Sequence, residues 1–177
     1  MDIKTIFGLP AHPLFVHVPV VLIPLVALGA IAMVLSARVR ERLGWTVLGL
    51  AIVAGLSTQL AVSSGKGLQH SVANSASLRH HIRIAESIRP LALLLFVVAL
   101  VVMLADRRGR GAWPYAGRPR ATTGTPVRAL LVVATVVVAV GTNIRLFQIG
   151  DSGAKATWER TRIGAASPGP SPGDQRR

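Results

Sequence analysis

The sequence predicts an all-α fold, an integral membrane four-helix bundle with a short amphipathic helix before the third span. Hydrophobic residues make up 51% of the 177 residues and charged residues only 15%, whereas about a quarter of the residues in ordinary soluble domains are charged. The apolar residues gather in four runs, and a membrane-spanning helix needs roughly 20 such residues. Basic residues lie between the runs, as is typical of membrane proteins. The four expected spans are residues 14–35, 45–62, 88–105 and 127–149.

The first run, residues 14–35, indicates a retained membrane helix rather than a signal peptide. Pro19 and Pro24 lie inside it, and membrane helices tolerate such kinks when neighbouring helices satisfy the freed carbonyl groups. Pro13 suits the first helical turn, where its missing N–H is not needed. A signal peptide would have a basic segment before a shorter apolar core. Only Lys4 precedes this run, so we expect the segment to remain as a span.

The second and third runs differ in their surroundings. Residues 36–44 form a basic loop with three arginines, and the second run, residues 45–62, then contains small residues that let helix backbones approach closely in lipid. Residues 63–89 are the most polar stretch. From Ser77 onward, apolar residues recur there at helical spacing, which predicts an amphipathic helix leading into the third span.

The fourth run, residues 127–149, is rich in valine, yet we expect a helix, because a lone strand in lipid would leave its backbone groups unsatisfied. Residues 106–126 before it are rich in Gly, Pro, Arg and Thr, which predicts an irregular loop. Residues 150–153 after it read Gly-Asp-Ser-Gly and indicate a short turn. We therefore expect one transmembrane domain, residues 1–162, and a disordered C-terminal tail, residues 163–177.

The composition limits which binding partners and which chemical sites can be expected. The formal charge is +13, from 20 Lys and Arg against 7 Asp and Glu. A soluble protein of this charge would suggest a nucleic-acid partner. Here the charge flanks segments of hydrocarbon length, so we expect the lipid bilayer as the partner and no nucleic acid. Cysteine is absent, which excludes disulfides, thiolate metal sites and cysteine nucleophiles.

The four spans divide the polar segments between two sides of the membrane. The loops 36–44 and 106–126 share one side, and their dense arginine clusters make it cytoplasmic by the positive-inside rule. Both termini and residues 63–89 are then extracytoplasmic. All five histidines fall on this second side, namely His12, His17, His70, His80 and His81. A single polar site at one mouth of the bundle explains this one-sided distribution.

The start of the first span carries a family resemblance. Residues 8–19 read Gly-x-Pro-x-His-Pro-Leu-x-Val-His-x-Pro, which resembles the opening of the bacterial membrane family known as domain of unknown function 2231. Further positions that resemble the family are Gly65, His80 or His81, and the Gly-Asp-Ser-Gly-Ala segment at residues 150–154. Lys66 stands where the family often has an acidic residue. The resemblance covers most of residues 8–160 and implies a four-helix protein of the bacterial plasma membrane, without an established activity.

The histidines support three hypotheses, which the sequence alone leaves open. In the first, the protein is a small electron-transfer protein in which His17 and His81, or His80 in its place, bind haem b. His17 is the most buried-looking of the five, about one turn inside the first span. Arg79 or Arg145 would pair with the haem propionates. This hypothesis predicts that His17→Ala abolishes a haem absorption band and leaves membrane insertion intact.

The other two hypotheses need no haem. In the second, a divalent metal or a proton binds among the histidines, with Glu86 or Asp151 completing the site; the candidate ligands are His12, His17, His70, His80 and His81. His12 and His17 are five residues apart, roughly 140° around a helix, so they would not point into one site unless the proline-rich start of the span is irregular. In the third, the histidines are structural, and the chain is a non-catalytic subunit that packs against a larger partner protein or forms a homo-oligomer.

Enzymatic activity other than a redox role is not indicated. Ser152 in Gly-Asp-Ser-Gly lacks the strand-turn-helix context of a hydrolase nucleophile. Residues 64–67 read Ser-Gly-Lys-Gly, which lacks the spacing of a phosphate-binding loop. The histidine cluster therefore remains the main candidate site.

Overall fold

The computed structural model describes residues 5–6, 9–69, 75–109 and 125–165, and these form a bundle of long helices. The elements are β1 (Thr5–Ile6), β2 (Leu9–Pro10), α1 (Ala11–Leu35), α2 (Ala37–Gln69), α3 (Ala76–Glu86), α4 (Ile88–Gly109) and α5 (Thr125–Ala165). The two-residue strands β1 and β2 pair antiparallel just before α1. Four segments are long and apolar enough to cross a membrane, namely Phe15–Leu35, Ala37–Lys66, Ala76–Ala105 and Pro126–Trp158. The predicted all-α fold with four spans is confirmed.

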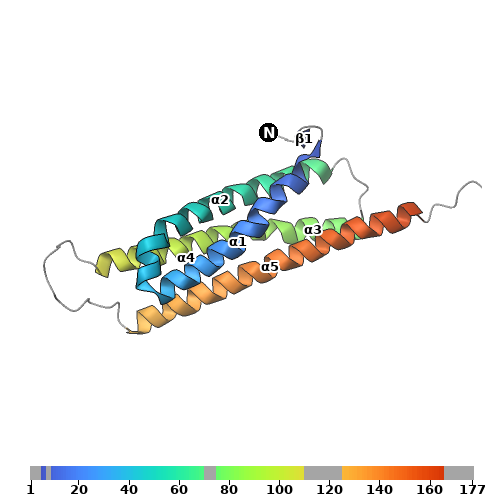
Figure 1. The fold of residues 1–177 in the computed structure, drawn as a ribbon. Coiled ribbons are helices and arrows are strands. Elements are labelled where there is room, and N and C mark those ends of the chain that lie inside the picture. Colours follow the sequence, from blue (N-terminus) through green and yellow to red (C-terminus); the bar gives the residue numbers. More distant parts are fainter. Residues whose placement is uncertain (1–4, 7–8, 70–74, 110–124, 166–177) are drawn as a thin grey trace, which may run out of the picture.

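The helices are arranged so that one end of the bundle collects the polar segments. Figure 1 shows α1 and α2 as an antiparallel hairpin, α3 and α4 almost in line, and α5 running along the whole bundle. The beginning of α1, all of α3 and the end of α5 lie at the same end. His12 and His17 on α1 and His80 and His81 on α3 are therefore at this end, whereas His70 lies outside the described residues.

The short amphipathic helix is present as α3, and serines delimit it. The Ser75 side chain accepts a hydrogen bond of 3.1 Å from the Leu78 N–H, which caps the start of the helix. At the other end, the Ser87 hydroxyl donates to the Ile84 carbonyl at 2.6 Å, and α4 begins at the next residue. No residue of α3 is fully buried, as expected of a helix at the edge of the bundle.

The basic segment 36–44, expected to be a loop, is almost entirely helical. Ser36 alone separates α1 from α2, and its Oγ accepts from the Val39 N–H at 3.4 Å. The Arg40 guanidinium donates from Nη1 to the Met33 carbonyl at 2.7 Å. These two bonds satisfy backbone groups that helix ends leave unpaired, so the corner needs no longer loop. The second span thus starts well before the expected residue 45.

Two further helices run beyond the ends that the sequence indicated. Residues 63–69 continue α2, and residues 150–153, interpreted above as a turn, are helical within α5. Inside these helices the hydroxyl groups of Ser64 and Ser152 are satisfied, because each donates to the carbonyl three residues earlier, at 2.9 Å in both cases. The division at residues 162 and 163 stays a prediction, and the tail from residue 166 lies outside the described residues, as does most of the expected loop 106–126.

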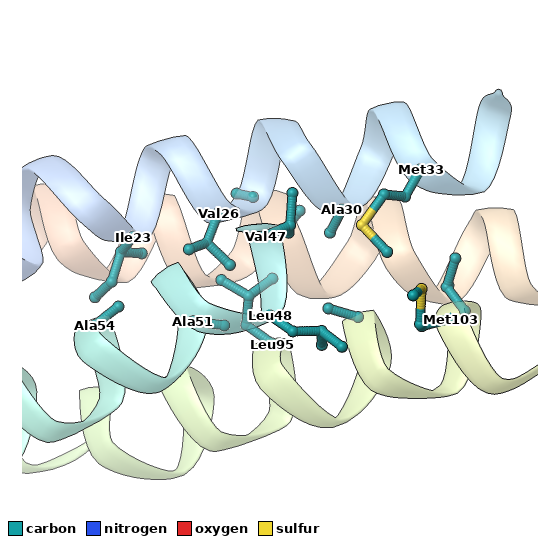
Figure 2. Close-up of a cluster of buried hydrophobic side chains, with 14 of the residues drawn as sticks. Ile23, Val26, Ala30, Met33, Val47, Leu48, Ala51, Ala54, Leu95 and Met103 are labelled. Atoms are coloured by element: carbon teal, nitrogen blue, oxygen red, sulfur yellow. The ribbon is translucent and has the colours of Figure 1, made fainter. Parts of the chain in front are cut away.

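The core is made of apolar side chains that come mainly from α1, α2 and α4, with Ala139 from α5. Figure 2 shows these buried residues in one layer, with labels on Ile23, Val26, Ala30, Met33, Val47, Leu48, Ala51, Ala54, Leu95 and Met103. The buried Thr58, Thr135 and Thr142 each donate to the carbonyl four residues earlier, at 2.6–2.7 Å. Many large apolar residues face outward, including Leu28 and Leu130 at 66% and 67% exposure, which suits contact with lipid chains.

Gly29 allows α1 and α2 to approach closely, and Gly29→Leu is expected to destabilise the bundle. A Cβ at Gly29 would lie 2.8 Å from Cγ2 of Val47, a buried side chain that is stiff because it is β-branched. We expect a loss of roughly 1–3 kcal/mol in the free energy of unfolding, measured by denaturation in mixed detergent micelles. Gly49→Leu is the matched control, since a Cβ there meets nothing within 4 Å. Equal losses in both variants would contradict this view of the α1–α2 contact.

Candidate functional site

The first half of the candidate site is formed by His12 on α1 and the end of α2. The Nδ1 atom of His12 lies 2.9 Å from the Ala61 carbonyl oxygen and 3.4 Å from the Ser64 Oγ. A carbonyl oxygen only accepts hydrogen bonds, so Nδ1 carries the proton. The imidazole ring rests on Gly65, where a Cβ would lie 3.0 Å from the His12 Cε1. His12 is thereby held by three positions of one helical turn.

The second half is formed by His81 on α3 and the end of α5. The Nδ1 atom of His81 lies 2.9 Å from the Ser152 Oγ. The Ser152 hydroxyl donates its own proton to the Ile149 carbonyl at 2.9 Å, so its oxygen accepts from the His81 Nδ1–H. The ring rests on Gly153, where a Cβ would lie 3.1 Å from the His81 Cε1. The contact with α5 therefore partly buries the His81 ring and holds it in place.

The two halves share one construction, which we call the His–Ser–Gly units: His12 with Ser64 and Gly65, and His81 with Ser152 and Gly153. In each unit the serine donates to the carbonyl three residues earlier and the next residue, a glycine, makes room for the ring. The units come from four different helices, and the charges of the two histidines are close enough to repel each other. The fold therefore places two similarly held imidazoles at one end of the bundle.

This arrangement orients both rings through Nδ1. Because Nδ1 is the donor in each neutral imidazole, Nε2 has no proton and keeps its lone pair. Histidines that bind metals almost always donate their other ring N–H to a carbonyl, a carboxylate or water, which fixes the tautomer and orients the ring. Here the acceptors of the ring N–H groups are the Ala61 carbonyl for His12 and the Ser152 hydroxyl for His81. Both His–Ser–Gly units are thus suited to present Nε2 as a ligand.

Two lysine–carboxylate pairs flank the units. The Lys66 Nζ lies 2.6 Å from the Glu86 Oε1 and joins the end of α2 to the end of α3. The Lys155 Nζ lies 2.7 Å from the Asp151 Oδ2, one turn apart on α5. Glu86 and Asp151, considered above as metal ligands, are therefore each paired with a lysine. Each lysine closely follows the glycine of a unit in the sequence, so an ion pair lies near both histidines.

The remaining predicted site residues lie elsewhere. His17 and His80 are exposed, as are Arg79 and Arg83, and Arg145 is half-buried on α5, two turns before Ser152. His70 lies outside the described residues. Within the described part of the chain, no group of three or more His, Cys, Asp or Glu side chains is close enough to hold a metal ion. The geometry thus brings together His12 and His81. The sequence analysis considered His12 as a metal ligand but not as a haem ligand.

The serines and glycines of the units were not predicted as functional residues. Ser64 and Ser152 had been considered only as parts of catalytic motifs, and Gly65 and Gly153 only as family positions or turns. The sequence nevertheless contains a pattern that could have indicated these residues. The dipeptide Ser-Gly occurs at both places on the membrane side that carries the histidines, each followed by a lysine within two residues.

A family comparison agrees with the fold. The model of the family described as predicted membrane protein (DUF2231) matches residues 8–165, which include both His–Ser–Gly units. Comparisons with curated proteins and with solved structures gave no match. The resemblance seen at residues 8–19 is therefore confirmed over nearly the whole described chain. The chain belongs to the DUF2231 family of predicted membrane proteins.

Proposed function

We propose that this membrane protein binds haem b between His12 and His81 and transfers electrons. The observation that carries the proposal is the pair of His–Ser–Gly units, which hold two imidazoles on different helices through Nδ1 and leave Nε2 of each neutral ring available as a ligand. Haem iron is commonly ligated in this way by histidine side chains from a protein. When bound, haem supplies one-electron chemistry between ferric and ferrous iron.

A two-histidine site favours haem over a free divalent ion. A porphyrin already provides four nitrogen ligands, so two imidazoles complete the coordination of its iron. A structural zinc site needs four protein ligands and a catalytic one usually three. The described residues offer no such group, and the nearest carboxylates, Glu86 and Asp151, are paired with lysines. The proposal therefore replaces His17 with His12 as the partner of His81.

Cations beside the units would serve the haem propionates. Arg79 and Arg145 remain the candidates, since Lys66 and Lys155 are each already paired with a carboxylate. A carboxylate is stabilised by such cations at the membrane interface. We place this end of the bundle on the extracytoplasmic side of a bacterial plasma membrane, in keeping with the arginine-rich opposite side.

A second candidate function, a non-catalytic subunit, is supported by the open glycines. A Cβ at Gly49, Gly55, Gly141 or Gly150 would meet nothing within 4 Å. Small residues on outward faces let a neighbouring membrane helix approach closely, either from a larger partner or from a second copy of the chain. In that case the His–Ser–Gly units would only hold the end of the bundle together.

A reduced-minus-oxidised visible spectrum separates these functions. The full chain is expressed with haem available, purified in detergent and supplied with haemin in excess, and unbound haemin is removed by gel filtration before the spectrum is recorded. We expect a Soret band and a sharp α-band at one haem per chain. A flat spectrum from a chain that far-ultraviolet circular dichroism shows to be helical would contradict haem binding, and elemental analysis of the same sample would then test for a bound metal.

Ser152→Ala is expected to weaken haem binding about 10- to 100-fold and to raise the midpoint potential, without unfolding the protein. The change removes the acceptor for the His81 Nδ1–H, which makes the imidazole a less basic ligand and so favours ferrous iron. A haemin titration and a redox titration measure the two effects. Ser57→Ala is the matched control, because Ser57 makes the same bond to a carbonyl three residues earlier, at 3.0 Å, in a place without a histidine. Equal behaviour of the two variants would contradict the role of Ser152.

A further inference from the structure

A groove of about 360 Å³ lies between α2 and α4, on a face that the proposed haem site does not use. Small residues, Ala51 and Gly55 of α2 and Ala92 of α4, leave the space that forms it. Leu93 and Phe96 add larger apolar side chains to its lining. Gly55 is open, since a Cβ there would meet nothing within 4 Å. The groove is mostly apolar and has the size of a small ligand site.

One end of the groove is polar. Gln59 of α2 and Arg89 of α4 line it there. The Arg89 Nη2 donates to the Ser63 Oγ at 3.3 Å, but its Nε is buried and has no hydrogen-bond partner among the described residues. A buried donor of a charged group without a partner is costly. Arg89 therefore lies at the polar end of an apolar groove with one of its N–H donors unpaired among the described residues.

The charges around Arg89 favour an anion. Its nearest acidic neighbour in the sequence, Glu86, pairs with Lys66 at 2.6 Å, and the Glu86 carboxylate also interacts with the charge of Arg89. Two cations share one carboxylate, which leaves one formal positive charge. Arginine forms strong, directed hydrogen bonds with phosphate groups. A singly charged phosphodiester would balance this group.

The position of the groove fits a lipid. Arg89 is the second residue of α4, at the start of the apolar run 88–105 within the candidate span Ala76–Ala105, where arginine can reach the headgroup level. From there the lining continues to Phe96, about 10 Å along the helix towards the centre of the membrane. We propose that the groove binds one anionic phospholipid, with its phosphate on Arg89 and one acyl chain along Gly55. This inference stands independently of the haem proposal.

Lipid selectivity of the full chain tests the proposal. The delipidated protein in detergent is given phosphatidylglycerol or phosphatidylcholine with identical acyl chains, and retained lipid is counted by native mass spectrometry. We expect phosphatidylglycerol to bind about tenfold more tightly, and Arg89→Gln to abolish this difference. Arg83→Gln is the control, because it removes the same charge from the exposed face of α3 and should leave the selectivity unchanged.

Two further comparisons test the position of the lipid. Gly55→Leu should fill the groove and lower retention of both phospholipids about tenfold, whereas Gly49→Leu, at an equally open position outside the groove, should not. Inorganic phosphate at millimolar concentration should not compete, since it lacks the chain. Equal binding of the two phospholipids by the unaltered protein, unchanged selectivity in Arg89→Gln, displacement by inorganic phosphate, or preferential retention of a neutral isoprenoid quinone would each overturn the proposal.

Discussion

His81→Ala is expected to abolish the sharp α-band of the reduced, purified protein, and His12→Ala is expected to do the same. Each substitution removes one of the two proposed ligands, and the other imidazole remains held by its own serine and glycine. With one histidine removed, the remaining imidazole alone would no longer give the iron the two-histidine ligation to which we attribute a sharp α-band. The visible spectrum of each variant after addition of haemin measures the loss.

The controls for this experiment are His17→Ala and His80→Ala. Both residues are exposed, His17 on α1 and His80 on α3, so their removal should leave the bands in place. Circular dichroism must show equal helix content in all four variants. Loss of the bands in His17→Ala together with their retention in His12→Ala would return the site to the pair that the sequence suggested. Loss in none of the variants would point to adventitious haem.

The choice between His12 and His17 shows what sequence alone could not supply. His17 looked more buried because it lies deeper in the first span, and depth along a helix is visible in the sequence. Orientation around the helix is not, since it depends on the packing against other helices. In the structure Pro19, Ile23 and Val26 of α1 face inward, and His12, seven residues before Pro19, lies on nearly the same side. His17 lies roughly 160° away from Pro19.

The spans themselves were predictable because hydropathy is a local property. The four apolar runs, the α3 helix and the family resemblance all follow from stretches of consecutive residues. The ends of the helices were harder to predict from the sequence. Residues 150–153 looked like a turn because of two glycines, but in α5 Gly153 serves a contact with a ring from another helix, 72 positions earlier in the chain. Such a contact has no local signature.

Gly153→Leu is expected to remove the haem bands as completely as loss of a ligand, although no ligand is altered. A Cβ at this position would already lie 3.1 Å from Cε1 and 3.4 Å from Nδ1 of His81, and a leucine side chain needs more room still. The ring must move, which breaks its 2.9 Å hydrogen bond to Ser152 and displaces Nε2. Leucine itself favours the helix by nearly 1 kcal/mol over glycine, so α5 is not weakened by propensity.

Gly150→Leu supplies the comparison that separates a ligand site from mere packing. Gly150 lies one turn earlier on α5, and a Cβ there would meet nothing within 4 Å. Both variants make the same chemical change in the same helix, so a difference between their spectra must come from the contact with His81. If both retain a haem spectrum, the ring of His81 is not where iron binds. A third outcome is that the unaltered protein shows no haem spectrum and only Gly153→Leu lowers the melting temperature. The His–Ser–Gly units would then only hold helices together. Only loss of the bands in Gly153→Leu, with retention in Gly150→Leu, makes the glycine contact part of a cofactor site.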